Sequence, residues 1–355
     1  MSGTSLDGVD AVLADFSRRP PLVRASAHHP FPAELRAQLL ALQVPGPNEI
    51  DRSAAAANSL ATSYAAAVDS VLSVAGTAND LVQAIGCHGQ TVRHRPERGY
   101  TTQIGNAALL AERTGIRVVS DFRSRDIAAG GQGAPLAPAF HAEVFSDRAE
   151  NRAILNIGGI ANLTGLRTDG TVIGFDCGPG NCLMDLWCAH HAGAAFDDSG
   201  RWAASGRVIP QLLQELLQEP YFAALPPKST GRDLFNEEWL RSRLADPVDP
   251  QSVQATLLEL TARTISDALG RFLAGTQRVI ACGGGTKNQA LMRRLRELLD
   301  TVILEPSDAH GIDPQLVEAL AFAWLARQAL LGRPGNLPAV TGAAAPRVLG
   351  AVYAR

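Results

Sequence analysis

Long apolar runs are missing from this sequence. No run reaches the roughly 20 residues that a membrane-spanning helix needs. The first residues, MSGTSLDGVD, also lack the basic and apolar regions of a signal peptide. These absences argue against a membrane-spanning or exported protein and predict a cytoplasmic one.

Cysteine is scarce as well. The cysteines are odd in number and scattered, a pattern typical of a reduced compartment rather than of a disulfide framework. They are Cys87, Cys177, Cys182, Cys188 and Cys282. Two of them lie near His190 and His191, but the spacing fits no common zinc site. The formal net charge of −3 argues against a nucleic-acid or anionic-membrane binder.

What is present is enough apolar sequence for a substantial core. The chain has 355 residues, of which 46% are hydrophobic, and this is the length of two or three domains. Apolar segments of helical and of strand length alternate, which predicts an α/β fold. Helices are expected at 33–43, 49–75, 106–113, 182–192, 206–218, 252–274, 289–299 and 314–331. Strands are expected at 9–16, 80–85, 116–120, 154–157, 163–166, 172–175, 278–281, 302–304 and 348–353.

A strand, a polar loop and a second strand occur near the start of each half, at 2–16 and 154–175. This repetition predicts two related α/β domains with a nucleotide between them, because clefts between domains commonly hold such ligands. We place the boundary near 125–135, where a segment has too many glycines for a core. The expected domains are residues 1–130 and residues 131–355.

The rest of the chain is organised around residues 154–185. Two strands lead into the segment DCGPGN at 176–181, after which a helix is expected. The glycines let backbone approach a ligand, Pro179 stiffens the elbow, and Asn181 is expected to cap the helix. A carboxylate at a strand end, facing the amides of a helix start, suits chemistry on an anionic substrate. Asp176 alone fits an ordinary capping role equally well.

A second candidate site is the polar loop at residues 3–8. Its amides, hydroxyls and carboxylates suit a phosphate and its magnesium ion. No Walker-type G-x-x-x-x-G-K-[ST] segment occurs in the chain, and by itself the loop is a hairpin tip. A hairpin needs a strand before its loop. Only Met1 and Ser2 precede this loop, too few residues for a strand, so we expect either that the strand is missing or that the start codon was assigned too late.

Two further features point to a ligand. The glycines at 283–285 stand between an expected strand and an expected helix, where they let a flat ring or a phosphate lie on backbone. A glycine-rich loop is weak evidence by itself. Glu318 lies on an otherwise apolar helix, and a carboxylate there is either paired or near a site.

Several segments, spread over nearly the whole chain, match the pattern of one family. They are MSGTSLDGVD at 1–10, GCHGQTVRH at 86–94, QIGN at 103–106, GGQGAPLAPAFH at 130–141, LNIGGIANLT at 155–164, GFDCGPGN at 174–181, PPKSTGR at 226–232, QATLLELTA at 254–262, GGGTKN at 283–288 and EALAFAWLA at 318–326. Together they resemble the anhydro-N-acetylmuramic acid kinases, which belong to the sugar kinase, Hsp70 and actin superfamily. The resemblance implies an actin-like ATPase fold, with two RNase-H-like α/β domains and a nucleotide cleft between them.

The resemblance also implies the reaction. ATP, water and 1,6-anhydro-N-acetylmuramic acid would become ADP and N-acetylmuramic acid 6-phosphate. One enzyme would open the anhydro bridge and phosphorylate the freed O6, with ATP and Mg²⁺ as cofactors. The reaction would serve peptidoglycan recycling in the cytoplasm. The expected partner is a small amino sugar, with neither nucleic acid nor membrane involved, and a homodimer is left open.

Site residues follow from the resemblance by position. Asp176 resembles the catalytic base, and Glu318 a helper at the sugar. The second phosphate loop would contain Gly158 and Gly159. The adenosine loop would contain Gly283, Gly284, Gly285 and Asn288. The first phosphate loop would contain Gly3, Thr4, Ser5, Leu6, Asp7, Gly8, Val9 and Asp10, with Asp7 or Asp10 near the magnesium. Family members usually carry an apolar strand before this loop, and this sequence departs from them there.

Two other functions stay open at this point. One is a different sugar or acyl kinase of the same superfamily, in which the base deprotonates a substrate hydroxyl and no water is consumed. The other is a non-catalytic, ATP-switched binding module like actin or Hsp70. Incorporation of oxygen from labelled water distinguishes the first, and sugar-dependent ADP release argues against the second.

Overall fold

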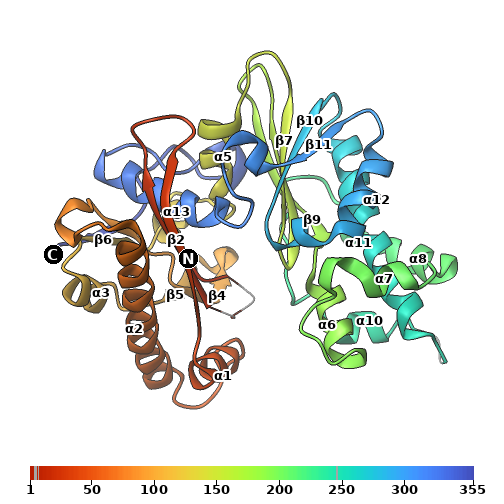
Figure 1. Ribbon diagram of the computed structural model, residues 1–355, viewed down its shortest axis with the longest axis horizontal. Coiled ribbons are helices and arrows are strands. Elements are labelled where there is room, and N and C mark those ends of the chain that lie inside the picture. The colour runs from red at the N-terminus through yellow and green to blue at the C-terminus, as the bar shows by residue number, and fades with distance from the viewer. Residues whose placement is uncertain (4–5, 7, 245–246) are drawn as a thin grey trace. The chain divides into compact units, whose positions relative to one another are not determined.

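The computed structural model describes residues 1–3, 6, 8–244 and 247–355. The chain forms two compact units, shown with their labelled elements in Figure 1. Unit 1 comprises Met1–Val144 and Leu316–Arg355, and unit 2 comprises Phe145–Gln315. Each combines helices with strands, so the expected α/β class is confirmed. In the described ranges, no helix is both long and apolar enough to cross a membrane.

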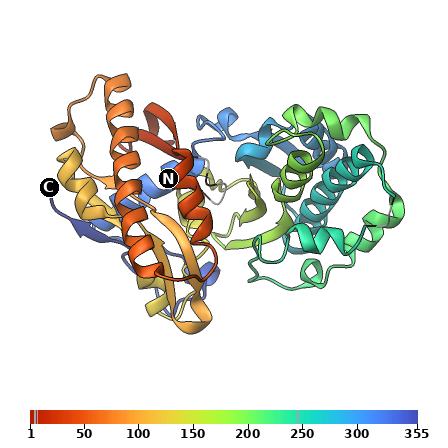
Figure 2. The same ribbon diagram turned by 90° about the horizontal axis from the view of Figure 1, so that it is seen from below.

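The described part of unit 1 holds three small sheets, and the long helix α2 runs beside two of them, β1-β2 and β4-β5 (Figure 2). The sheets have the strand orders β1-β2, β12-β6-β3 and β4-β5. The strands are β1 (Gly8–Asp15), β2 (Leu22–Pro30), β3 (Ile85–Gly86), β4 (Gln90–Arg95), β5 (Tyr100–Ile104), β6 (Val118–Ser120) and β12 (Ala351–Tyr353). The helices are α1 (Ala33–Ala41), α2 (Glu49–Ala75), α3 (Ala107–Thr114), α4 (Ser124–Ala128), α5 (Ala137–Phe145, whose last residue opens unit 2), α13 (Val317–Leu330) and α14 (Pro338–Thr341).

Unit 2 is built on a five-stranded sheet with the order β11-β10-β7-β8-β9. β10 is parallel to β7 and β11, whereas β8 is antiparallel to β7 and β9. The strands are β7 (Arg152–Ile157), β8 (Ile160–Leu166), β9 (Val172–Pro179), β10 (Arg278–Cys282) and β11 (Ile303–Pro306). The helices are α6 (Cys182–His191), α7 (Arg201–Ser205), α8 (Pro210–Leu217), α9 (Pro220–Ala223), α10 (Glu237–Arg241), α11 (Pro250–Phe272) and α12 (Gln289–Leu299).

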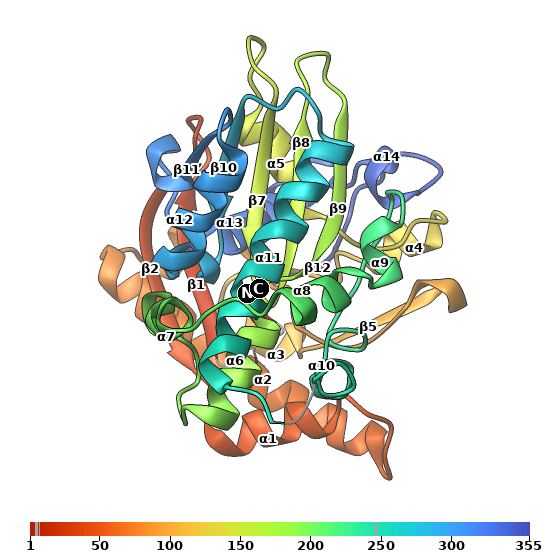
Figure 3. The same ribbon diagram turned by 90° about the vertical axis from the view of Figure 1, so that its right-hand side faces the viewer.

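Helix α11 crosses one face of the unit 2 sheet (Figure 3). Leu155 and Ile157 of β7 lie in the same core as Leu260 of α11. Ile154 points to the opposite face and is also fully buried. Burial on both faces explains why three successive residues of β7, Ala153, Ile154 and Leu155, are apolar instead of alternating with polar ones.

The expected division after residue 130 differs from the observed units in two respects. The chain leaves unit 1 later, at Val144, and its C-terminal segment returns to unit 1 instead of staying with unit 2. In that return, β12 pairs antiparallel with β6. Helix α13 packs so tightly on β3 that a Cβ at Gly86 would lie 2.2 Å from the Phe322 carbonyl oxygen. Sequence order alone does not reveal such a return.

The glycine-rich segment at 130–135 is anchored in unit 1 by one buried carboxylate. Asp126 accepts hydrogen bonds from the Gly133 amide (2.8 Å), Asn336 Nδ2 (2.6 Å) and Thr341 Oγ1 (2.8 Å). Its side chain has no exposed surface. The segment is therefore held by the returning C-terminal chain, and its glycines do not mark a linker.

Most expected helices and strands are present, and α2 and α12 have the predicted bounds. Residues 80–85 are an exception, because Asn79–Leu81 form a 3₁₀ turn and only Ile85–Gly86 pair as β3. Asn181 precedes α6 as expected, but its side chain does not cap the helix. Instead its Nδ2 donates to the Ile157 carbonyl at 3.4 Å.

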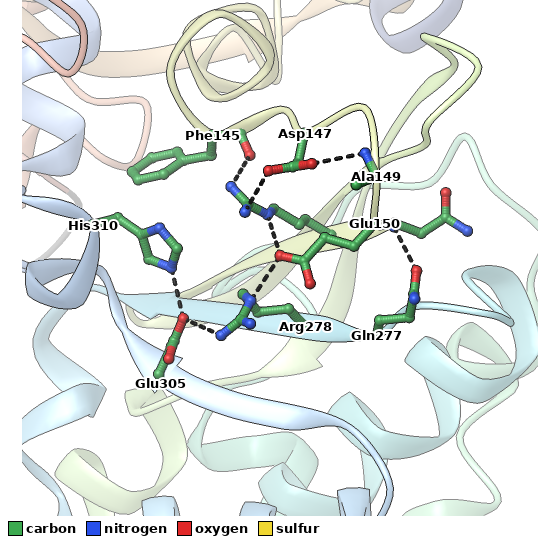
Figure 4. A network of polar contacts seen from close by, with 10 residues as sticks. Phe145, Asp147, Ala149, Glu150, Gln277, Arg278, Glu305 and His310 are labelled. Atoms are coloured by element: carbon green, nitrogen blue, oxygen red, sulfur yellow. Dashed lines mark hydrogen bonds and ion pairs between the residues drawn. The ribbon is translucent and has the colours of Figure 1, made fainter.

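Charged residues join the strands of unit 2 near their amino ends (Figure 4). Glu150 accepts hydrogen bonds from Arg152 Nε (2.7 Å) and Arg278 Nε (2.8 Å). Arg278 Nη1 also donates to Glu305 at 2.6 Å, and the same oxygen lies 2.7 Å from His310 Nε2. These contacts tie β10 to the start of β7 and to β11. The side chains of Glu150, Arg152 and Arg278 are each less than a quarter exposed.

Unit 1 contains a cavity of about 950 Å³ beside the free edge of β1. It is lined by β1, by residues 81–88 around β3, and by parts of α2 and α13. At one end the Met1 amino group donates to the Asp10 carbonyl (2.7 Å), and the Asp10 amide donates to the Met1 carbonyl (2.9 Å). Burial lowers the pKa of this amino group. Asp10 therefore turns its N–H and C=O away from β2, as does Val12 two residues along.

We predict that an extension of about five alternating apolar residues ahead of Met1 stabilises unit 1. Such a strand would continue the Met1–Asp10 pairing along β1 and fill the cavity. The melting temperature should rise by about 5 °C, with ATP bound at least as tightly. The control is a glycine–serine extension of equal length, and equal melting temperatures for the two would contradict the prediction.

Candidate functional site

Three strands of unit 2 end at the same edge of its sheet. β10 is parallel to β7, and β9 shares their direction because two antiparallel steps separate it from β7. The turn at 158–159, the elbow at 178–181 and the glycine loop at 283–287 therefore lie at one edge. In α/β sheets the carboxyl ends of strands are where ligands bind.

The elbow and the turn are joined through their backbones. The amides of Gly180 and Cys182 donate to the Gly159 carbonyl (2.9 and 3.1 Å), and the Asn181 amide donates to the Gly158 carbonyl (2.8 Å). A Cβ at Gly180 would lie 2.3 Å from the Gly158 oxygen, so only glycine fits there. At Gly158, by contrast, the nearest atom to a Cβ would be 3.6 Å away. Packing therefore explains Gly180 and leaves Gly158 open to a ligand.

Asp176 lies on β9, just before this elbow. Its Oδ2 accepts the Thr230 amide at 2.9 Å, and its backbone carbonyl accepts the Tyr221 hydroxyl at 2.9 Å. Burial raises the pKa of Asp176 to about 6, opposed by the Thr230 N–H and the Lys228 ammonium. A carboxylate with this pKa is ionised at neutral pH and accepts a proton more readily than an exposed aspartate does. The geometry suits a general base.

Asp176 belongs to a polar row across the sheet. In the strand registers, Asn156 of β7 pairs with Asn162 of β8, and Asn162 pairs with Asp176. Paired residues point to the same face of a sheet. Sequence reasoning did not select the two asparagines. Their signal was available, since each is a polar residue with an apolar neighbour on either side in its strand.

The three glycines at 283–285 differ in how much space surrounds each of them, and so in the reason why a glycine is required. Gly283 has φ of +84°, and its Cβ would lie 2.4 Å from Asn156 Oδ1. A Cβ at Gly285 would lie 2.2 Å from the Ile157 side chain. Gly284 has no such conflict, because the nearest protein atoms to its Cβ would be 4.0 Å away. Only Gly284 presents open backbone, so it is the position where a ligand is able to lie on the loop.

Asn288 has a structural role in this loop. Its Oδ1 accepts the Leu291 amide at 3.0 Å and thereby caps α12. A second side chain, Gln315, also holds the loop, and the sequence did not suggest it. Gln315 Nε2 donates to the Gly283 carbonyl (3.0 Å) and lies 3.3 Å from Thr286 Oγ1. No local pattern marks Gln315, because its contacts are with residues far away in the sequence.

The predicted first phosphate loop lies in unit 1 and is described only in part. Thr4, Ser5 and Asp7 lie outside the described residues. Of the others, Leu6 and Val9 are buried in the core of unit 1. The remaining predicted residues are Gly3, Gly8 and Asp10. A Cβ at Gly8 would lie 2.5 Å from the His29 carbonyl oxygen, so packing on β2 explains this glycine.

Asp10 is the described candidate for the magnesium. It is about half exposed, and its Oδ1 lies 2.8 Å from His28 Nδ1. Its other oxygen has no hydrogen-bond partner in the part of the chain that the structure describes. No group of three or more His, Cys, Asp or Glu side chains among the described residues is arranged to hold a metal ion.

Glu318 is exposed in the first turn of α13, although the residues on either side of it are buried. Burial lowers the pKa of Arg123 to about 10, and the charge of Glu318 opposes that effect. Arg123 Nη2 donates to His88 Nε2 (2.9 Å), and Arg123 Nη1 donates to the Gly133 carbonyl (2.8 Å). The charge of Glu318 therefore acts on the Arg123 guanidinium. Through its two hydrogen bonds, that guanidinium joins the segments 86–94 and 130–141 of unit 1.

The predicted residues thus fall into two groups. Unit 2 brings together Asp176, the turn at 158–159 and the glycine loop at 283–285, all at one sheet edge. Unit 1 holds Glu318 and the described part of the segment at 3–10. Each of the two groups therefore belongs to a single unit.

Comparison with known proteins gives the family. The family model of anhydro-N-acetylmuramic acid kinase matches residues 1–355. A protein of that name from Cupriavidus pinatubonensis is 56% identical, over 100% of this chain and 97% of its own length. One from Nitrosospira multiformis is 53% identical, over 99% and 97%. The solved structure of (R)-2-hydroxyglutaryl-CoA dehydratase component A from Acidaminococcus fermentans is 13% identical, covers 88% of this chain and 96% of that chain, and has a TM-score of 0.44. That likeness is too weak to add to the assignment. The family predicted from the motifs is confirmed, and the chain belongs to the anhydro-N-acetylmuramic acid kinase family.

Proposed function

We propose that this protein transfers the γ-phosphoryl group of ATP to 1,6-anhydro-N-acetylmuramic acid while water opens the anhydro bridge. The product is N-acetylmuramic acid 6-phosphate, formed in peptidoglycan recycling in the cytoplasm, where ATP is supplied. The observation that carries the proposal is Asp176, a partly buried carboxylate with a pKa of about 6 beside two glycine turns at one sheet edge. Membership of the kinase family supplies the substrate class.

Asp176 acts as the base in this mechanism. Thr230 donates to Oδ2 and so fixes the carboxylate, while Oδ1 has no hydrogen-bond partner among the described residues. Water is a poor nucleophile, so Oδ1 takes its proton as the water oxygen bonds to C1 of the sugar. The C1–O6 bond breaks, and O6 attacks the γ-phosphorus in line, releasing ADP. The proton remains on Asp176 until the product leaves.

Backbone groups bind the nucleotide in this proposal. The adenosine lies on Gly284, where the loop is open, and the phosphates lie at the turn 158–159 of the same unit. Mg²⁺ typically keeps several waters and takes one or two protein carboxylates beside phosphate oxygens. Asp10, with one oxygen lacking a partner among the described residues, fits that requirement. When bound, the ion supplies charge neutralisation on the phosphoryl group.

The proposed reaction is tested by incubating the protein with ATP, Mg²⁺ and 1,6-anhydro-N-acetylmuramic acid in oxygen-labelled water. The product should carry one phosphoryl group and one labelled oxygen at C1, both visible by mass measurement. A phosphorylated sugar without label would identify a kinase that consumes no water. ADP release that does not depend on the sugar would favour an ATP-switched binding module.

Asp176→Asn should lower turnover by about 10²–10⁴-fold, because the amide keeps the shape but does not accept the proton. In the unchanged protein kcat/KM should fall as pH drops below about 6, since protonation of Asp176 removes the base. The measurements are product formation, ADP release across pH, and ligand binding by calorimetry. Asp185→Asn is the matched control, because the pKa of Asp185 is also raised to about 6 by burial. Near-normal turnover in Asp176→Asn would remove it from the base role, and lost ATP binding would make it a nucleotide or magnesium ligand.

Gly284→Val should weaken ATP binding about tenfold or more, the cost of forcing an added side chain against a packed group. Without nucleotide, a Cβ added at Gly284 would lie 4.0 Å from the nearest protein atoms, so the melting temperature should change little. Gly270→Val, at an α11 position with nothing within 4 Å, is the control. ATP bound normally by a folded Gly284→Val variant would show that the adenosine lies elsewhere.

A further inference from the structure

The side chain of Gln315 is held at the glycine loop in one orientation. Its Nε2 donates to the Gly283 carbonyl at 3.0 Å. It also lies 3.3 Å from Thr286 Oγ1, whose own hydroxyl donates to the Gly283 carbonyl at 2.7 Å. Thr286 Oγ1 therefore faces Gln315 as an acceptor. Turning the amide over would place Oε1 against two acceptors, so the network assigns nitrogen to this side and oxygen to the other.

The free oxygen of this amide faces the open part of the loop. Gln315 Oε1 would be 4.0 Å from a Cβ at Gly284 and has no hydrogen-bond partner in the described part of the chain. Asn181 Nδ2 lies at the same distance from that point. Its bond to the Ile157 carbonyl fixes it as a donor with one N–H left over. One acceptor and one donor therefore border the same space, and both are oriented by protein contacts.

We propose that Gln315 selects adenine over other purines, by accepting a hydrogen bond from the 6-amino group of the base. The inference rests on the proposed function, because it takes the Gly284 space as the place of the base. Adenine presents a 6-amino donor beside ring-nitrogen acceptors, which matches an oxygen acceptor paired with an amide donor. Asn181 Nδ2 supplies that donor. Guanine and hypoxanthine carry an oxygen at position 6, which would face Gln315 Oε1 as a second acceptor.

The pre-set orientation of Gln315 gives the selection its strength. A freely rotating glutamine would turn its amide over and donate to a 6-oxo group, so it would accept either kind of base. Here the turned amide would lose its bonds to Gly283 and Thr286 and leave acceptors facing one another. Gln315 is thus a specificity-determining residue for the nucleotide, and it is distinct from Asp176 on β9, the proposed general base of the reaction.

The test compares three nucleotides that differ at position 6 of the purine. They are ATP, purine riboside triphosphate, which lacks the amino group, and inosine triphosphate, which has an oxygen there. With the sugar present, kcat/KM for ATP should exceed that for purine riboside triphosphate by about tenfold, and that for inosine triphosphate by more. In Gln315→Leu the ratio of ATP to purine riboside triphosphate should fall to about one. The matched control Gln214→Leu, at an exposed position on α8, should keep the ratio of the unchanged protein.

The ratio separates recognition from general damage, because a poorly folded variant loses both nucleotides alike. An unchanged ratio in Gln315→Leu overturns the inference, as does equal use of the three nucleotides by the unchanged protein. If Gln315→Leu is inactive, calorimetric binding of ATP and inosine triphosphate to the unchanged protein decides, and equal affinities overturn the inference. Failure of the proposed function looks different, since no nucleotide would then phosphorylate the sugar.

Discussion

Three backbone hydrogen bonds, from residues 180–182 to the carbonyls of Gly158 and Gly159, fix the site edge of unit 2. They hold the end of β9 against the turn between β7 and β8. Thr261 of α11 adds a bond from its hydroxyl to the Gly180 carbonyl at 3.0 Å. Because a Cβ at Gly180 would prevent this approach, the position of Asp176 depends on one small residue four places away.

The polar groups at the amino ends of the unit 2 strands are arranged differently from those at the carboxyl ends. At the amino ends, charges are matched with charges through Glu150, Arg278 and Glu305 (Figure 4). At the carboxyl ends, polar groups are oriented, but within the part of the chain that the structure describes one oxygen of Asp176 and one of Gln315 lack a hydrogen-bond partner. Unsatisfied polar groups cost stability unless a ligand meets them. The sheet therefore has one edge suited to holding the strands together and one suited to binding.

The fold class was predictable, and parts of the candidate site could be proposed, because their signals are local. The apolar run at 154–157, the helix at 289–299 and the DCGPGN elbow each depend on near neighbours, and α12 has its predicted bounds. Asn288 was expected only in the adenosine loop, and its capping of α12, although a local contact, was not predicted. The placement of Gln315 was not predictable, because it depends on a loop that begins about thirty residues earlier in the chain. The same holds for the return of 316–355 to unit 1, which depends on pairing between β12 and β6.

The chain order of the two units has a consequence for synthesis. Unit 2 is one continuous segment, Phe145–Gln315, inserted into unit 1, which is discontinuous. A ribosome therefore delivers all of unit 2 while unit 1 still lacks α13, α14 and β12. Domains fold as units during translation, N-terminal ones first where they are contiguous. Here the order is inverted: Asp126 stays without Asn336 and Thr341 until the last part of the chain emerges, so the half that starts first finishes last.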